Sequence, residues 1–292
     1  MVMDVAVCNF ADDTTIFAND LRLEDVLEQL EANALILSKW FPENFMKLNK
    51  EKCHLLIVGG NQEGAKISIG EAVIKESPEE KLLGVTIDKN LNFNSHISNL
   101  CKKASQKLHA LARVSPFMDA EKLRILMNSF IKAQFSYCPL IWMFHDRRLN
   151  SKIDKIHERA LRIVYNDSQS DFSALLKLDN AVSVHQRNLQ CLLIEIYKTK
   201  NNLNPSFMSE IFEERKVHYD LRSKNTLQSL NARTTAHGIE SVRFLGHKLW
   251  KTIPNYIKES QSLTSFKKQL KTLHLKCSCR LCKSYISGLG YI

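Results

Sequence analysis

Two adjacent carboxylates, Asp12 and Asp13, are the residues of this sequence most suited to chemistry. The apolar run VMDVAVC precedes them and the β-branched segment TTIFA follows, a pattern that predicts a β-hairpin with both carboxylates at its tip. Adjacent like charges repel each other. A divalent cation bound by both carboxylates would offset that repulsion, because Mg²⁺ prefers hard oxygen ligands. Two-metal phosphoryl-transfer enzymes use such carboxylates to clamp the attacking and leaving oxygens. The alternative is that Asp-Asp simply forms a good turn.

The elements that would hold this turn alternate between strands and one helix. Apolar positions at spacings of three and four predict a helix from a cap at Asp20 to about Trp40, where Pro42 would stop it. Downstream, the sequence predicts a strand over 55–58, a hairpin over 66–75 and a strand over 82–87. The first part of the chain is therefore expected to be α+β.

Both the secondary-structure pattern and the charge change near residue 95. Residues 1–100 carry 9 basic and 16 acidic side chains, a net of −7, whereas residues 101–292 carry 32 and 15, a net of +17. Helical periodicity dominates the second part, apart from a polar loop at 215–237. The coincidence predicts a domain boundary, and the basic part is expected to meet a polyanion such as nucleic acid.

One predicted helix concentrates this positive charge. Five cations step along it at intervals of four, three, four and three, which places them on one stripe: Arg148, Lys152, Lys155, Arg159 and Arg162. An apolar stripe runs one residue further along, so the helix could dock on a core and still present a positive edge to phosphates. Lys102 and Lys103 on the preceding helix are weaker candidates. A merely solvated amphipathic helix is the competing interpretation.

Three segments in order resemble the reverse transcriptases of non-long-terminal-repeat retrotransposons, in particular jockey-like elements. The first is the aromatic-Ala-Asp-Asp turn formed by Phe10, Ala11, Asp12 and Asp13. The second joins Trp40 and Asn44 to the run Lys47-Leu48-Asn49-Lys50. The third resembles the primer grip and contains Leu83, Gly84, Val85, Ile87 and Asp88. The resemblance extends over essentially the whole chain.

The resemblance implies an RNA-directed DNA polymerase with three parts. Residues 1–94 would be a partial palm with Mg²⁺ on Asp12 and Asp13 and the primer grip at Leu83–Val85. Residues 95–166 would be a helical thumb, and residues 167–292 a helical C-terminal region. The partner would be a hybrid of RNA and DNA, template and primer.

The family also places a further metal-binding aspartate, the fingers and a nucleotide-selecting helix before the Asp-Asp turn. This sequence begins eleven residues before Asp12, so we expect a truncated polymerase that cannot polymerise alone. The alternative is a non-catalytic nucleic-acid-binding remnant. The two differ in metal-dependent nucleotide incorporation.

A cysteine-rich segment near the C-terminus forms the pattern H-x2-C-x-C-x2-C. Its members, His274, Cys277, Cys279 and Cys282, could close one tetrahedral Zn²⁺ site. The alternative is a reduced, frayed tail.

Composition limits the class of protein. With 44% hydrophobic and 25% charged residues, the chain has the composition of an ordinary globular protein. Its apolar runs are too short to span a membrane, and its start lacks the basic and apolar regions of a signal peptide. We therefore expect an intracellular protein, cytoplasmic or nuclear, with reduced cysteines.

Overall fold

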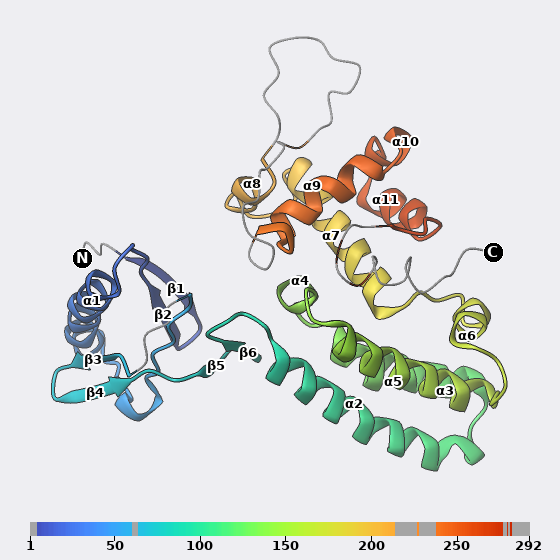
Figure 1. The fold of residues 1–292 in the computed structure, drawn as a ribbon, viewed down its shortest axis with the longest axis horizontal. Coiled ribbons are helices and arrows are strands. Elements are labelled where there is room, and N and C mark those ends of the chain that lie inside the picture. Colours follow the sequence, from blue (N-terminus) through green and yellow to red (C-terminus); the bar gives the residue numbers. More distant parts are fainter. Residues whose placement is uncertain are drawn as a thin grey trace, which may run out of the picture. The chain divides into compact units, whose positions relative to one another are not determined.

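The computed structural model describes residues 5–59, 64–213, 227, 238–276, 279 and 281. The chain divides into two compact units, Met1–Phe93 and Asn94–Ile292 (Figure 1). The first combines β-hairpins with a long helix, and the second is helical in its described part. The α+β class expected from the sequence is therefore confirmed. The assignment of residues 1–94, 95–166 and 167–292 to palm, thumb and C-terminal region stays a prediction.

Three antiparallel hairpins and one long helix form the first unit. The helix, α1, spans Leu23–Glu43. The hairpins pair β1 (Ala6–Phe10) with β2 (Asp13–Phe17), β3 (Lys66–Ile69) with β4 (Ala72–Lys75), and β5 (Glu79–Leu82) with β6 (Val85–Asp88). A small core lies where α1 meets β3 and contains Ala34, Leu55, Ile67, Ile69 and Ile74.

Several local predictions in this unit are wrong. Asp20 does not cap α1, because its carboxylate accepts from the amide of Leu21 at 2.6 Å. The helix continues past Trp40 to Glu43 and includes Pro42, although proline cannot donate to the carbonyl four residues earlier. Residues 55–58 form no strand, since Leu55 makes only an isolated bridge to Glu76. The expected strand over 82–87 is interrupted by the turn between β5 and β6.

The second unit is built from helices of very different lengths. The long ones are α2 (Asn94–Val114), α5 (Arg147–Tyr165), α7 (Val184–Lys200) and α9 (Val242–Thr252). The shorter ones are α3 (Ala120–Leu126), α4 (Pro139–Trp142), α6 (Phe172–Leu178), α8 (Met208–Ile211), α10 (Asn255–Lys258) and α11 (Leu263–Leu270). Figure 1 shows α2, α3 and α5 side by side, and α2 and α5 pack directly on each other.

Helix α7 lies at the centre of a hydrophobic core of this unit. It packs against α9 and α11, and the ring of Tyr197 stacks on that of Phe266 with centroids 4.2 Å apart. Gly246 lets α9 approach closely, because a Cβ there would lie 2.9 Å from Phe212 Cε1 and 3.1 Å from Ile196 Cδ1. In the described part of the chain, no helix is both long enough and apolar enough to cross a membrane.

Candidate functional site

Helix α5 presents a row of cations to solvent. Arg148, Lys152, Lys155 and Arg159 are all exposed, while Leu149, Ile153, Ile156 and Ala160, each one position later, are buried about a quarter turn around the helix. The helix starts at Asp146, whose Oδ1 accepts from the Leu149 amide at 2.7 Å, and it ends at Asn166 in the left-handed conformation. The charged stripe and the apolar stripe predicted from the sequence therefore lie on two separate faces of α5.

Arg162 differs from the other members of this row. Its guanidinium is half-buried and donates from Nη2 to Glu158 Oε1 at 2.8 Å, one helical turn earlier. Nη1 also donates to the carbonyl of Asp167 at 3.4 Å. From here on, the basic stripe means the four exposed residues Arg148, Lys152, Lys155 and Arg159, because Arg162 already has a carboxylate partner.

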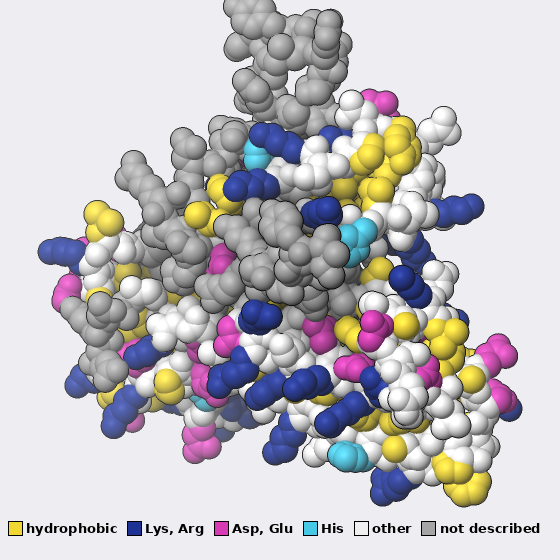
Figure 2. Space-filling view, turned by 45° about the vertical axis from the view of Figure 1, so that its right-hand side comes forward, with side chains coloured by type: hydrophobic (Ala, Val, Ile, Leu, Met, Phe, Trp, Pro, Cys, Tyr) yellow, Lys and Arg dark blue, Asp and Glu magenta, His cyan; other side chains and the backbone are white. Residues whose placement is uncertain are grey.

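Helix α2 adds cations close to the basic stripe. Lys102 and Lys103 are exposed, and α2 packs on α5. Burial raises the pKa of the Cys101 thiol on α2 to about 11, and the charge of Lys152 on α5 opposes that rise. Figure 2 shows Lys and Arg side chains, in dark blue, gathered in a row across the lower part of the visible face. The two helices therefore offer a combined positive surface.

A buried ionic cluster fixes the helices behind this surface. Asp179 follows α6, and its side chain is 1% exposed. Its Oδ1 accepts from Arg124 Nε at 2.6 Å and from the hydroxyl of Tyr165 at 2.8 Å, while Lys132 Nζ lies 3.7 Å from Oδ2. Burial lowers the pKa of Lys132 and raises that of Tyr165, whereas the Arg124 side chain is 48% exposed, so Arg124 forms the solvent-facing side of the cluster. The cluster connects α3 and the end of α5 to the residue that ends α6.

The buried face of α5 also contains a histidine. His157 is 1% exposed, and its ring packs edge-on against Phe172 with centroids 5.5 Å apart. Burial lowers its pKa to about 3, with a smaller contribution of the same sign from Lys132. Asp179 opposes this shift, and Arg187 adds to it. The imidazole is therefore neutral in the folded protein across the physiological range.

His157 makes the protein sensitive to acid. At His157 the unfolded chain binds a proton near pH 6.5 and the folded chain only near pH 3. The contribution of His157 to the free energy of unfolding is therefore fully present above pH 6.5 and falls as the pH falls towards 3. The slope from this residue is about 1.4 kcal/mol per pH unit. Between pH 7 and pH 5 the free energy of unfolding should fall by about 2 kcal/mol less in the H157Q variant than in wild type. Urea denaturation at the two pH values measures this difference.

The control for this prediction is the H109Q variant. His109 lies on the exposed side of α2, so its removal should leave the wild-type decrease between the two pH values intact. Equal decreases in wild type and H157Q would contradict the burial argument.

The two carboxylates predicted to bind metal lie at the first hairpin. Phe10 pairs with Asp13, so Ala11 and Asp12 form a two-residue turn, and Ala11 has a φ of 52°. Asp12 and Asp13 are both exposed. They are suitable oxygen donors for a divalent cation. In the described part of the chain, however, no group of three or more His, Cys, Asp or Glu side chains is placed to hold a metal ion.

The hairpin around this turn also exposes apolar side chains. Every residue of β1 is exposed, and Phe10 and Phe17 are 65% and 51% exposed. The hairpin is attached through β2, which contacts α1 and packs Ile16 against the core of the unit. Asp12 and Asp13 lie at its exposed end.

The segment that resembles a primer grip is the tight turn between β5 and β6. Leu83 and Gly84 form the turn with φ values of 46° and 89°, and Val85, the first residue of β6, is buried. Positive φ at both central residues suits a two-residue hairpin loop. The carboxylate of Asp88, the last residue of β6, accepts from the amides of Asn90, Asn92 and Phe93. These hydrogen bonds fix the backbone at the end of the first unit.

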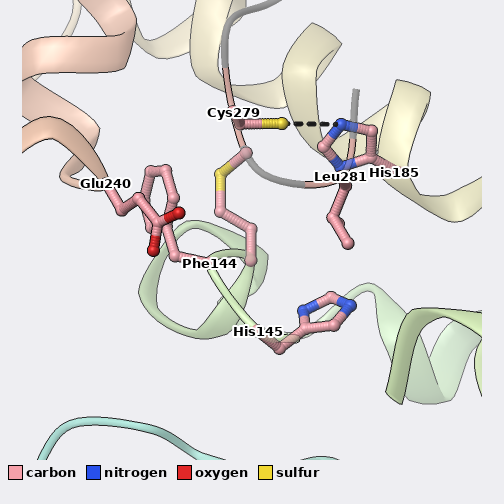
Figure 3. Close-up of a pocket in the computed structure, with 7 residues that line it drawn as sticks. Phe144, His145, His185, Glu240, Cys279 and Leu281 are labelled. Carbon is pink, nitrogen blue, oxygen red and sulfur yellow. Dashed lines mark hydrogen bonds between the residues drawn. The ribbon is translucent and has the colours of Figure 1, made fainter. Parts of the chain in front are cut away.

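The cysteine-rich segment is described only in part, since Cys277 and Cys282 lie outside the described residues. His274 is exposed, whereas Cys279 is buried with its Sγ 3.5 Å from Nε2 of His185 (Figure 3). Sequence reasoning missed His185, because it lies 94 residues before Cys279 and no local spacing connects the two.

Comparisons with known proteins find relatives of low sequence identity. Over 99 residues the chain is 26% identical to the RNA-directed DNA polymerase from mobile element jockey of Drosophila melanogaster, covering 33% of this chain and 11% of that polymerase. Over 277 residues it is 22% identical to the retrovirus-related Pol polyprotein from type-1 retrotransposable element R1 2 of Nasonia vitripennis. The chain is distantly similar to non-LTR retrotransposon reverse transcriptases.

This similarity covers unequal shares of the proteins compared. The match to the R1 polyprotein includes 83% of this chain but 65% of that polyprotein, so the chain spans less than two thirds of either relative. No family model matches the chain, and no solved structure matches it.

Proposed function

We propose that this chain is part of an RNA-directed DNA polymerase of a non-LTR retrotransposon and that its helical unit binds the hybrid of template and primer. The basic stripe on α5 is the observation that carries the proposal. Its four cations are exposed together, while their helix is anchored by the buried face and the Asp179 cluster. Such an edge suits a phosphate backbone, which offsets the repulsion between neighbouring cations.

The α2 lysines and Arg162 have secondary parts in this proposal. Lys102 and Lys103 extend the positive surface, whereas Arg162 would need to exchange its ion pair with Glu158 before it could bind a phosphate. We therefore rank Arg162 below the basic stripe as a nucleic-acid contact.

Asp12 and Asp13 are proposed as two carboxylate ligands of catalytic Mg²⁺. When bound, this metal ion would stabilise the charge that develops on the transferred phosphate. The two side chains provide hard oxygen donors at the tip of an exposed hairpin, and Leu83–Val85 is proposed to contact the primer strand. We propose that the 292-residue chain binds nucleic acid without polymerising, because among the described residues no third metal-ligating side chain joins Asp12 and Asp13.

The experiment combines primer extension with hybrid binding. The purified chain is mixed with an RNA template annealed to a labelled DNA primer, deoxynucleotides and Mg²⁺. We expect salt-sensitive binding of the hybrid and no extension of the primer. The D12A and D13A variants should bind the hybrid as tightly as wild type.

The outcomes distinguish an active polymerase from a chain that binds nucleic acid without catalysis. Extension that is abolished in D12A would show that the chain is an active polymerase by itself and would overturn the proposed inactivity. Failure to bind the hybrid at low salt would overturn the nucleic-acid-binding function.

A further inference from the structure

The segment that follows α3 leaves an aromatic ring at the surface. Its buried residues follow one another at intervals of four, which is more than the 3.6 residues of an α-helical turn: Leu123, Met127, Ile131 and Phe135. The π-helical turn η3 (Met127–Ile131) accommodates this longer interval, and the short 3₁₀ helix η4 (Lys132–Phe135) follows it. Phe130 precedes the buried Ile131 by one position and is 51% exposed.

Two lysines of α2 accompany this ring. The Lys107 ammonium lies 5.9 Å from the centroid of the Phe130 ring, which is within the range of a cation–π interaction. Lys103 lies one helical turn earlier on the same side of α2 and is exposed. An exposed aromatic ring beside two cations combines a stacking surface with charges for phosphates, and proteins that bind single strands use this combination.

Arg187 of α7 fixes the segment that carries the ring. Its Nη1 donates to the Lys132 carbonyl at 3.4 Å and to the Ser136 hydroxyl at 3.0 Å, and its Nη2 donates to the Phe135 carbonyl. Both η3 and η4 also pack on α2. The backbone on either side of Phe130 is therefore held in place before any ligand arrives, which lowers the entropic cost of binding.

The charge around Phe130 favours a polyanion over an apolar protein partner. Residues 94–145 carry seven basic and two acidic side chains. The two carboxylates, Asp119 and Glu121, lie at the start of α3, and Asp119 is paired with Lys122 at 2.6 Å. Lysine is depleted in protein–protein interfaces, so the two lysines beside Phe130 suit a strand of phosphates better than a protein surface.

We propose that Phe130, together with Lys107 and Lys103, binds an unpaired base of a single strand that continues from the RNA–DNA hybrid. This inference rests on the proposed function, because the basic stripe on α5 holds the hybrid itself. The Phe130 ring stacks on the base, and the two lysines neutralise phosphates of the same strand. Every base has a π-face, so the site holds the strand without reading its sequence.

The experiment compares two RNA–DNA hybrids that differ only in a single-stranded RNA overhang. Fluorescence anisotropy near 0.1 M salt measures the affinity of the full-length chain for each hybrid. We expect wild type to bind the overhang hybrid about ten-fold more tightly than the blunt one. The F130A variant should lose most of this gain and bind the blunt hybrid as wild type does, whereas F130W should keep the gain because its indole also stacks on bases.

The Lys107 charge has a separate readout. In the K107A variant the magnitude of the salt slope should decrease by about 0.7 for the overhang hybrid, the value for one phosphate of a single strand, and stay unchanged for the blunt hybrid. Equal changes of slope for the two hybrids would contradict a contact between Lys107 and the single strand.

The F207A variant is the matched control, since Phe207 is an exposed aromatic residue of the same unit and lies just before α8. It should bind both hybrids as wild type does. The inference is overturned if F130A keeps the gain, if F130A weakens both hybrids equally, or if F207A loses the gain as F130A does. Wild type that binds the blunt hybrid and gains nothing from the overhang overturns this inference alone, whereas wild type that binds neither hybrid overturns the proposed function as well.

Discussion

Replacing Asp179 by asparagine lowers the free energy of unfolding by about 2 kcal/mol, because Lys132 loses its buried carboxylate while the half-exposed Arg124 is rehydrated. Arg124 and Lys132 both interact with Asp179, and the pKa of Lys132 is already lowered by burial. Removing the carboxylate is costly for Lys132, whose charge stays poorly hydrated, and costs little for Arg124, whose side chain is 48% exposed. Urea denaturation at pH 7 measures the effect.

The D119N variant is the control for this change. Asp119 pairs with Lys122 at 2.6 Å, but both side chains are more than half exposed. Exposed pairs contribute at most about 1 kcal/mol, and asparagine caps a helix as well as aspartate does. If D179N and D119N had equally small effects, the Asp179 cluster would not be what holds α3, α5 and α6 together.

Removing three cations of the basic stripe weakens nucleic-acid binding by about two orders of magnitude near 0.1 M salt. The variant combines K152A, K155A and R159A, and each phosphate that the protein no longer neutralises lowers the affinity by somewhat less than one power of ten at this salt concentration. The substitutions lie on the exposed face of α5, so the buried face and the fold should be unaffected. Fluorescence anisotropy with a labelled RNA–DNA hybrid measures the affinity.

The control variant has the same change in net charge at another place in the helical unit. It combines K267A, K268A and K271A, which lie in or just after α11 and are exposed. We expect its affinity to stay within about three-fold of wild type, because only long-range electrostatics change. Equally weakened binding in both variants would show that net charge, and no particular surface, governs binding.

Local periodicity predicted the elements that carry the candidate surface. The stripe on α5 depends on spacings of three and four, and the structure confirms both its exposed cations and its buried apolar face. The hairpin over 66–75 was predicted because Gly70 supplies a turn with positive φ, 61° in the structure. These features depend on residues close together in the sequence, where propensity and pattern determine structure.

Tertiary contacts account for what the sequence could not predict. Leu55 is buried in the core near α1 and β3 and makes only an isolated bridge to Glu76. The apolar run 55–58 was therefore wrongly predicted to be a strand. Asp179 and Arg124 are 55 residues apart, and His185 and Cys279 are 94 apart. Such pairs leave no spacing signal, because the fold alone brings them together. Within α5, the spacing of the cations did not indicate the ion pair that Arg162 forms with Glu158, one turn earlier.

The most direct test of the proposed function is the salt dependence of hybrid binding by wild type and by the K152A/K155A/R159A variant. The logarithm of the association constant falls linearly with the logarithm of salt concentration, with a slope set by the number of phosphates that the protein neutralises. We predict that the magnitude of this slope decreases by about two to three in the α5 variant and is unchanged in the α11 control. Identical slopes in wild type and the α5 variant would show that the basic stripe does not bind phosphates.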